Sequence, residues 1–88
     1  MATVLIIDDR AVDREFLRSV LEAMGHDVTE AEDGDEALSL ARQLIPSLIL
    51  SDILLPRRDG FSVCRALQKD PELRHVPFVF VTATRPPP

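Results

Sequence analysis

The sequence contains no tryptophan or tyrosine, only one cysteine and three glycines, and its apolar runs are short. A helix needs about 20 predominantly apolar residues to cross a bilayer, so the sequence predicts no membrane span. The lone cysteine, Cys64, cannot form an internal disulfide, which suits a reducing compartment. We therefore expect a cytoplasmic chain that makes no contact with a membrane.

A surplus of basic residues is also absent. The 88 residues carry a net charge of −5, whereas proteins that bind nucleic acid usually present clusters of Lys and Arg to the phosphate backbone. We expect no direct nucleic acid binding by this segment. A chain of this length forms one small core, so a single domain is predicted.

The chain instead alternates short apolar runs with helical patterns. Strand-like runs cover residues 4–7, 27–31, 48–50 and 76–81, and helical patterns cover residues 10–24, 35–44 and 61–68. Strands separated in this way by helices form right-handed crossovers and a parallel sheet. The sequence therefore predicts an α/β fold, in which the first and third strands are neighbours.

Two of the helical patterns indicate which side chains face the core. The apolar residues of the first recur at helical spacing, and those of the last are expected on its inner face. The residues at this spacing in the first helix are Phe16, Leu17, Val20, Leu21 and Met24, and the expected inner-face residues of the last are Phe61, Cys64 and Leu67.

Aspartates close two of the predicted strands. Asp8 and Asp9 follow the first strand, and Asp52 follows the third. Ligands of parallel α/β sheets bind beyond the carboxyl ends of the strands, so we expect the three carboxylates to meet there. Hard oxygen ligands of this kind suit Mg²⁺. Any one aspartate could simply cap a helix or begin a turn, but that reading is weaker for all three together.

The sequence resembles the receiver domains of response regulators in two-component signalling. The resemblance covers residues 3 to 84 and has four parts in order: the acidic pair after the first strand, Asp52 after the third, residues 52–60, and residues 81–83. The segment 52–60, DILLPRRDG, is similar to the family's D-x-x-M-P-x-x-D-G loop, with Leu55 in place of the usual Met. Any one part is weak evidence, whereas the ordered set is specific.

The resemblance implies a phosphorelay function. Asp52 would accept a phosphoryl group from a phosphohistidine on a sensor histidine kinase or phosphotransfer protein. Thr82 would bond the phosphoryl oxygen, and the small Ala83 would leave room for the phosphate. Such a domain is a signalling receiver rather than an enzyme, with at most self-catalysed phosphoryl transfer and hydrolysis. The resemblance implies a Mg²⁺ site formed by Asp8, Asp9, Asp52 and the backbone carbonyl of Leu54.

The resemblance also implies a flavodoxin-like, doubly wound parallel sheet of order 2-1-3-4, here truncated before the fifth strand. Receivers carry a phosphate-binding Lys after that strand, and no lysine follows Lys69. The last run, 76–81, is apolar on both faces, which is typical of an interior strand. We expect a partial receiver domain over residues 1–84, an extended proline tail over 85–88, and a possible homodimer or sheet-completing partner. The alternative function is an interaction or dimerisation module only.

Overall fold

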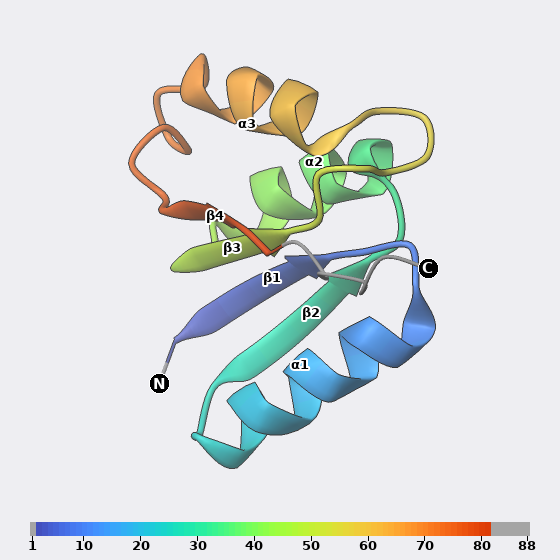
Figure 1. Ribbon diagram of the computed structural model, residues 1–88. Coiled ribbons are helices and arrows are strands. Elements are labelled where there is room, and N and C mark those ends of the chain that lie inside the picture. Colours follow the sequence, from blue (N-terminus) through green and yellow to red (C-terminus); the bar gives the residue numbers. More distant parts are fainter. Residues whose placement is uncertain (1, 82–88) are drawn as a thin grey trace.

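The computed structural model describes residues 2–81 as a four-stranded parallel sheet with helices on both faces (Figure 1). The strand order β2-β1-β3-β4 confirms the predicted order, and every pairing is parallel. In chain order the elements are β1 (Thr3–Ile7), α1 (Ala11–Ala23), β2 (Asp27–Ala31), α2 (Gly34–Leu44), β3 (Leu48–Ser51), α3 (Gly60–Gln68) and β4 (Phe78–Phe80).

Strand β1 lies in the interior of the sheet, and its sequence explains why. It pairs with β2 on one side and β3 on the other, so that Ile6 lies opposite both Glu30 and Leu50. Four consecutive residues, Val4 to Ile7, are at most 1% exposed. A strand covered on both faces needs apolar residues at every position rather than at alternate ones, which is the pattern of this run.

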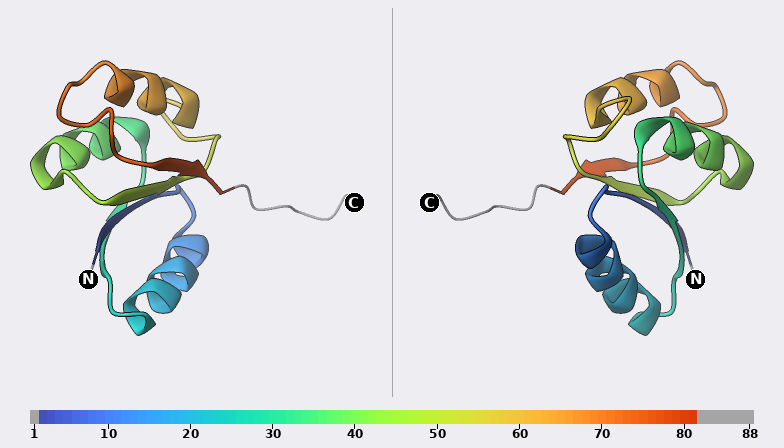
Figure 2. Two further views of the ribbon diagram at one scale, coloured as in Figure 1. Left: turned by 90° about the vertical axis from the view of Figure 1, so that its left-hand side faces the viewer. Right: turned by 90° about the vertical axis from the view of Figure 1, so that its right-hand side faces the viewer.

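The helices form two unequal layers. Seen edge-on, α2 and α3 cover one face of the sheet and α1 covers the other (Figure 2). Strands alternate the faces to which their side chains point, so β1 sends Leu5 and Ile7 towards α2 and α3, and Val4 and Ile6 towards α1. No residue of α1 is fully buried, whereas α2 and α3 bury four and three residues respectively.

The structure separates the apolar residues of the first helical pattern into packed and exposed ones. In α1, Leu17 and Leu21 pack on the core, but Phe16, Val20 and Met24 are exposed. The residues of this list recur on two stripes of the helix, and only one stripe can face the sheet.

In α3, the buried residues are Gly60, Val63 and Leu67. Phe61 is 47% exposed and Cys64 is half-buried, so neither is part of the core. The face of α3 that carries Gly60 packs against the end of β3, since a Cβ on Gly60 would lie 2.5 Å from the carbonyl oxygen of Asp52. The helix can approach the end of β3 this closely only with glycine at that position.

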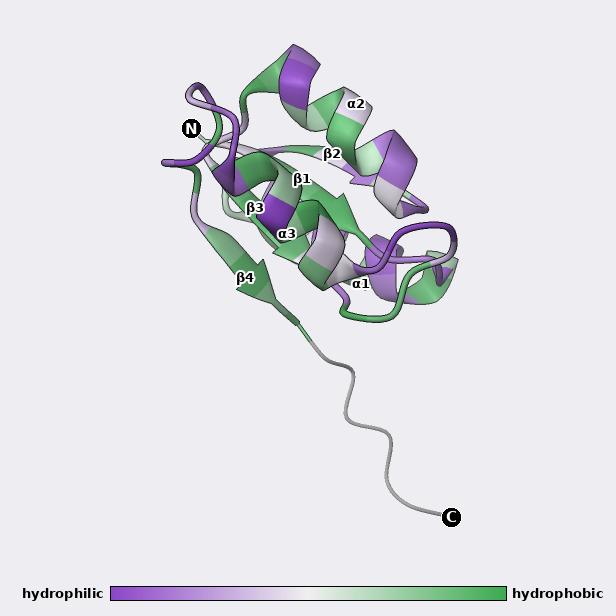
Figure 3. Cartoon of the chain, turned by 90° about the horizontal axis from the view of Figure 1, so that it is seen from above, coloured by the Kyte–Doolittle hydropathy of each residue, from purple (hydrophilic) through white to green (hydrophobic). Residues whose placement is uncertain are grey.

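Strand β4 is apolar along its length (Figure 3) but shorter than predicted. Phe78 and Phe80 are half-buried, and Val79 is 46% exposed. The predicted domain limit at residue 84 and the tail over 85–88 lie outside the described residues. Among residues 2–81, no helix combines the length and the apolar character needed to cross a bilayer.

Candidate functional site

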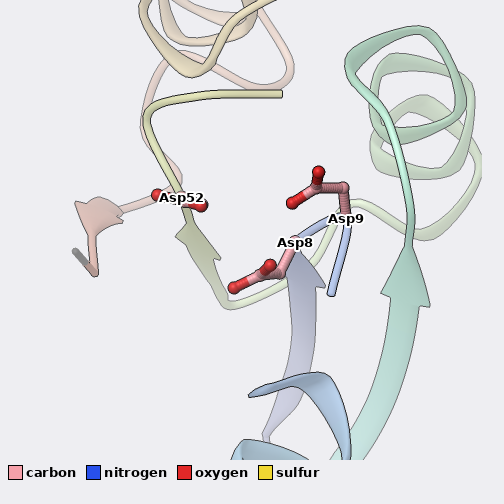
Figure 4. A group of neighbouring side chains, drawn as sticks. All are labelled: Asp8, Asp9 and Asp52. Carbon is pink, nitrogen blue, oxygen red and sulfur yellow. The ribbon is translucent and has the colours of Figure 1, made fainter. Parts of the chain in front are cut away.

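Three carboxylates meet at the carboxyl ends of β1 and β3 (Figure 4). Asp8, Asp9 and Asp52 each offer an oxygen atom, and these atoms all lie within 4.8 Å of one another. The structure therefore brings together the three aspartates that the sequence placed at one edge of the sheet.

Backbone hydrogen bonds hold the two strand ends in register. The amide of Asp52 donates to the carbonyl oxygen of Ile7 at 2.9 Å, and the amide of Asp8 donates to that of Ala31 at 3.1 Å. These bonds continue the ladders beyond the last strand residues, so the side chains of Asp8 and Asp52 are positioned by the sheet rather than by loops.

The three aspartates differ in burial. Asp8 is 5% exposed, Asp52 is half-buried and Asp9 is exposed. Burial raises the pKa of Asp8 above its ordinary value, and the charge of Asp52 adds to this. The backbone amide of Arg10, which donates to Asp8 Oδ1 at 2.9 Å, lowers that pKa without reversing the shift. Burial therefore disfavours the ionised form of Asp8.

The carboxylate of Asp52 has one oxygen fixed by the backbone. The amide of Ile53 donates to Oδ1 at 2.8 Å, and the hydroxyl of Ser51 donates to the carbonyl oxygen of Asp52 at 2.7 Å. Oδ2 lies 3.7 Å from the Arg10 guanidinium. A carboxylate with one oxygen held and the other directed into the site has the arrangement that a nucleophile needs.

Arg10 is a member of the site that the sequence analysis did not identify. Its NH2 lies 2.8 Å from Asp13 Oδ2 and 3.7 Å from Asp52 Oδ2, and its Nε lies 3.6 Å from Asp8 Oδ1. The only sequence signal is its position directly after the acidic pair. Arg10 also precedes α1 as its N-cap residue and provides no side-chain cap. Neither Asp8 nor Asp9 is the N-cap residue of this helix, but Asp8 Oδ1 accepts a hydrogen bond from the Arg10 amide and so begins a turn, as the simpler reading expected of a single aspartate.

The remaining predicted site residues are placed only in part. Leu54 lies in the loop after β3 and is 78% exposed, so its side chain does not pack in the core. The amide of Gly60 donates to the carbonyl oxygen of Ile53 at 2.8 Å and anchors this loop to the start of α3. Thr82 and Ala83 lie outside the described residues.

The donor set fits a hard divalent cation. Three carboxylates supply oxygen ligands, and oxygens bound to an octahedral Mg²⁺ at about 2.1 Å lie about 3 to 4 Å apart. The observed spread of up to 4.8 Å is close to that range. The raised pKa of Asp8 also indicates a site that a cation would stabilise, because a positive charge favours the ionised carboxyl.

Comparisons with known proteins agree on one family. The family model of the response regulator receiver domain matches residues 4–88. The chain is 42% identical over 82 residues to Response regulator PleD of Caulobacter vibrioides, covering 93% of this chain and 18% of PleD. It is also 42% identical over 82 residues to Protein PilH of Pseudomonas aeruginosa, covering 93% of this chain and 68% of PilH.

A solved structure shows the same fold. The signal receiver domain of a signal transduction histidine kinase from Syntrophus aciditrophicus superposes with a TM-score of 0.89 at 33% identity. The superposition covers 99% of this chain and 66% of that domain. The chain thus spans about two thirds of this domain and of PilH, and less than a fifth of PleD.

Proposed function

The chain belongs to the family of response regulator receiver domains, and we propose that it accepts a phosphoryl group on the carboxylate of Asp52 in a two-component phosphorelay. The observation that carries this proposal is the convergence of three carboxylates within 4.8 Å at one edge of the sheet. The proposed Mg²⁺ ligands are Asp8, Asp9, Asp52 and the backbone carbonyl of Leu54.

The proposed reaction is a direct displacement. The free oxygen of Asp52 attacks the phosphorus atom, the bond from phosphorus to the donor nitrogen breaks, and the donor histidine leaves as the neutral imidazole after protonation. Bound Mg²⁺ would neutralise negative charge on the transferring phosphoryl oxygens. The Ile53 amide, which holds Oδ1 at 2.8 Å, keeps the attacking carboxylate in one orientation.

The proposed donor is a phosphohistidine on a sensor histidine kinase or a phosphotransfer protein. The relative PleD is named as a response regulator, and the Syntrophus aciditrophicus domain belongs to a histidine kinase. By the family resemblance, the hydroxyl of Thr82 would bond the phosphoryl oxygen. The small side chain of Ala83 would leave room for the phosphate. We propose that these steps take place in the cytoplasm.

A second candidate is an interaction or dimerisation module that is not phosphorylated. The observation that favours it is a row of exposed apolar side chains on α1, where Val12, Phe16 and Met24 are 66% to 76% exposed. A surface of this kind is typical of a contact with another protein.

Phosphoryl uptake separates the two functions. The chain is incubated with acetyl phosphate and Mg²⁺, and its intact mass is measured. We expect a gain of one phosphoryl group, lost in Asp52→Asn and when a chelator removes the metal. Asp27→Asn makes the same chemical change at the opposite rim of the sheet and should retain the adduct. A folded wild-type chain that gains no mass, or an Asp52→Asn chain that still does, would contradict the proposal.

A further inference from the structure

The Arg10 guanidinium lies among three carboxylates of the acidic site. It is within 4.0 Å of the carboxylates of Asp8, Asp13 and Asp52. Among residues 2–81, no other basic side chain comes that close to the carboxylate of Asp8 or of Asp52. This one guanidinium therefore supplies the nearest positive charge to the aspartates of both strands.

Arg10 is held by charge and not by directed hydrogen bonds. Its contacts with Asp8 and Asp52, at 3.6 and 3.7 Å, are too long for hydrogen bonds. Its contact with Asp13 Oδ2 is short at 2.8 Å, but that oxygen accepts no hydrogen bond. Moving away from Asp8 and Asp52 would therefore break ion pairs and not hydrogen bonds.

Arg14, one turn further along α1, shows the opposite arrangement. It donates from Nε to Glu30 Oε1 at 3.0 Å and from NH1 to the carbonyl oxygen of Asp8 at 2.8 Å. The Arg14 side chain is 11% exposed, against 29% for Arg10. Arg14 is thus part of the fixed structure, whereas Arg10 is more exposed and has weaker directional contacts.

We propose that Arg10 and a divalent cation compete for the same carboxylates, so that Arg10 sets the metal affinity of the site. The inference rests on the proposed function in one respect, namely that Asp8, Asp9 and Asp52 bind the metal. A cation that arrives between Asp8 and Asp52 repels the guanidinium, and the long side chain moves out towards solvent. Metal binding therefore includes the cost of breaking the Arg10 ion pairs, and removing Arg10 removes that cost.

Mn²⁺ binding tests the inference without reference to phosphorylation. The electron paramagnetic resonance signal of free Mn²⁺ is followed as each protein is added at about 0.15 M salt, where charges further away are screened. We expect Arg10→Gln to bind Mn²⁺ about tenfold more tightly than the wild type, a change of about 1.4 kcal/mol. Arg10→Lys, which keeps the charge on a shorter and unforked side chain, should fall between the two.

The matched control is Arg57→Gln. Arg57 lies in the loop after β3, is 71% exposed, and pairs with Asp33 at 3.8 Å instead of with the three aspartates. The Arg57→Gln substitution removes the same charge from the same end of the sheet. We expect the Mn²⁺ affinity of this variant to stay within about twofold of the wild type. An equal gain in both variants would mean that total charge, and not the position of Arg10, controls the affinity, and would overturn the inference.

The remaining outcomes separate the inference from the proposed function. If the wild type takes up a phosphoryl group but Arg10→Gln binds Mn²⁺ no more tightly, only the inference fails. If Arg10→Gln binds Mn²⁺ and the wild type does not, the inference is supported. If no variant binds Mn²⁺, the inference fails, and phosphoryl uptake by the wild type decides the proposed function separately. Circular dichroism checks that Arg10→Gln folds, and Arg10→Lys supplies the comparison if it does not.

Discussion

The two faces of the sheet are held to their helices by different forces. On the face of α2 and α3, a cluster of ten buried residues fills the interface, among them Leu5, Ile49 and Leu67. On the face of α1, the buried cluster has only three members, Val4, Ile6 and Val28. Buried apolar area is the main source of stability in a small domain. The face of α2 and α3 therefore carries most of the folding free energy.

Helix α1 is also attached to the sheet through arginines. Arg14 and Arg18 both donate hydrogen bonds to the carboxylate of Glu30 on β2, and Arg18 also donates to the carbonyl oxygen of Val28 at 3.0 Å. The carboxylate of Asp8, at the carboxyl end of β1, lies next to the same helix, in a pocket of about 170 Å³ lined by Asp8, Asp13, Phe16, Leu17 and Val81. The face of α2 and α3 is therefore held mainly by apolar burial, whereas the face of α1 combines a small apolar cluster with polar contacts.

The sharpest test of this difference is a leucine truncation on each face. Leu67 on α3 is 4% exposed within the larger cluster, and Leu21 on α1 is only partly buried. We expect Leu67→Ala to lower the free energy of unfolding by about 3 kcal/mol and Leu21→Ala by about 1 kcal/mol, because the exposed site leaves a smaller cavity. Urea denaturation followed by circular dichroism measures both. Equal losses would show that the α1 face is as well packed as the other.

The fold was largely predictable because its strongest signals are local. Apolar runs with β-branched residues mark the buried strands, and the aspartates that close two of them mark the edge where ligands bind. The predicted second strand, 27–31, has the observed bounds, and the three helices begin and end within one residue of the predicted limits. Asp8, Asp9 and Asp52 followed from strand ends and order alone.

What the sequence could not settle depends on partners distant in the chain. Both apolar stripes of α1 have helical spacing, and the choice between them follows from Arg14 and Arg18 reaching Glu30, 16 and 12 residues away. The inward face of α3 depends on the close approach of Gly60 to Asp52. The position of the Arg10 side chain depends on its contacts with three carboxylates, one of which, that of Asp52, is distant in the sequence. None of these contacts leaves a periodic signal.

The pH dependence of stability tests how much the buried carboxyl of Asp8 costs the fold when it is ionised. Burial raises the pKa of Asp8, so the folded chain binds its proton more tightly than the unfolded chain does. This contribution to stability is fully present below the ordinary value of 3.8 and is lost as the pH rises through the raised pKa. With a chelator present, Asp8→Asn should therefore be more stable than the wild type near pH 7, and the difference should vanish near pH 3.

Paired urea denaturations at the two pH values measure this effect, which we expect to be smaller than that of Leu67→Ala. Asparagine retains an oxygen that can accept the hydrogen bond from the Arg10 amide. The exposed Asp27 at the amino end of β2 gives the control, and Asp27→Asn should change stability near pH 7 by less than about 0.5 kcal/mol. A wild type that is the more stable protein near pH 7 would mean that Arg10 compensates fully for the burial of Asp8.

The smallest expected effect comes from a phenylalanine on the α1 side. Phe16 is 68% exposed on α1, whereas Phe61 on α3 packs against Phe80 with ring centroids 4.8 Å apart. We expect Phe16→Gln to change the free energy of unfolding by less than about 0.5 kcal/mol, because little apolar area returns to water. Phe61→Gln should cost about 1 to 2 kcal/mol, since it removes an aromatic pair as well as buried area. If Phe16→Gln were the more destabilising change, the exposed apolar residues of α1 would contribute to stability. The face of α2 and α3 would then not carry most of the folding free energy.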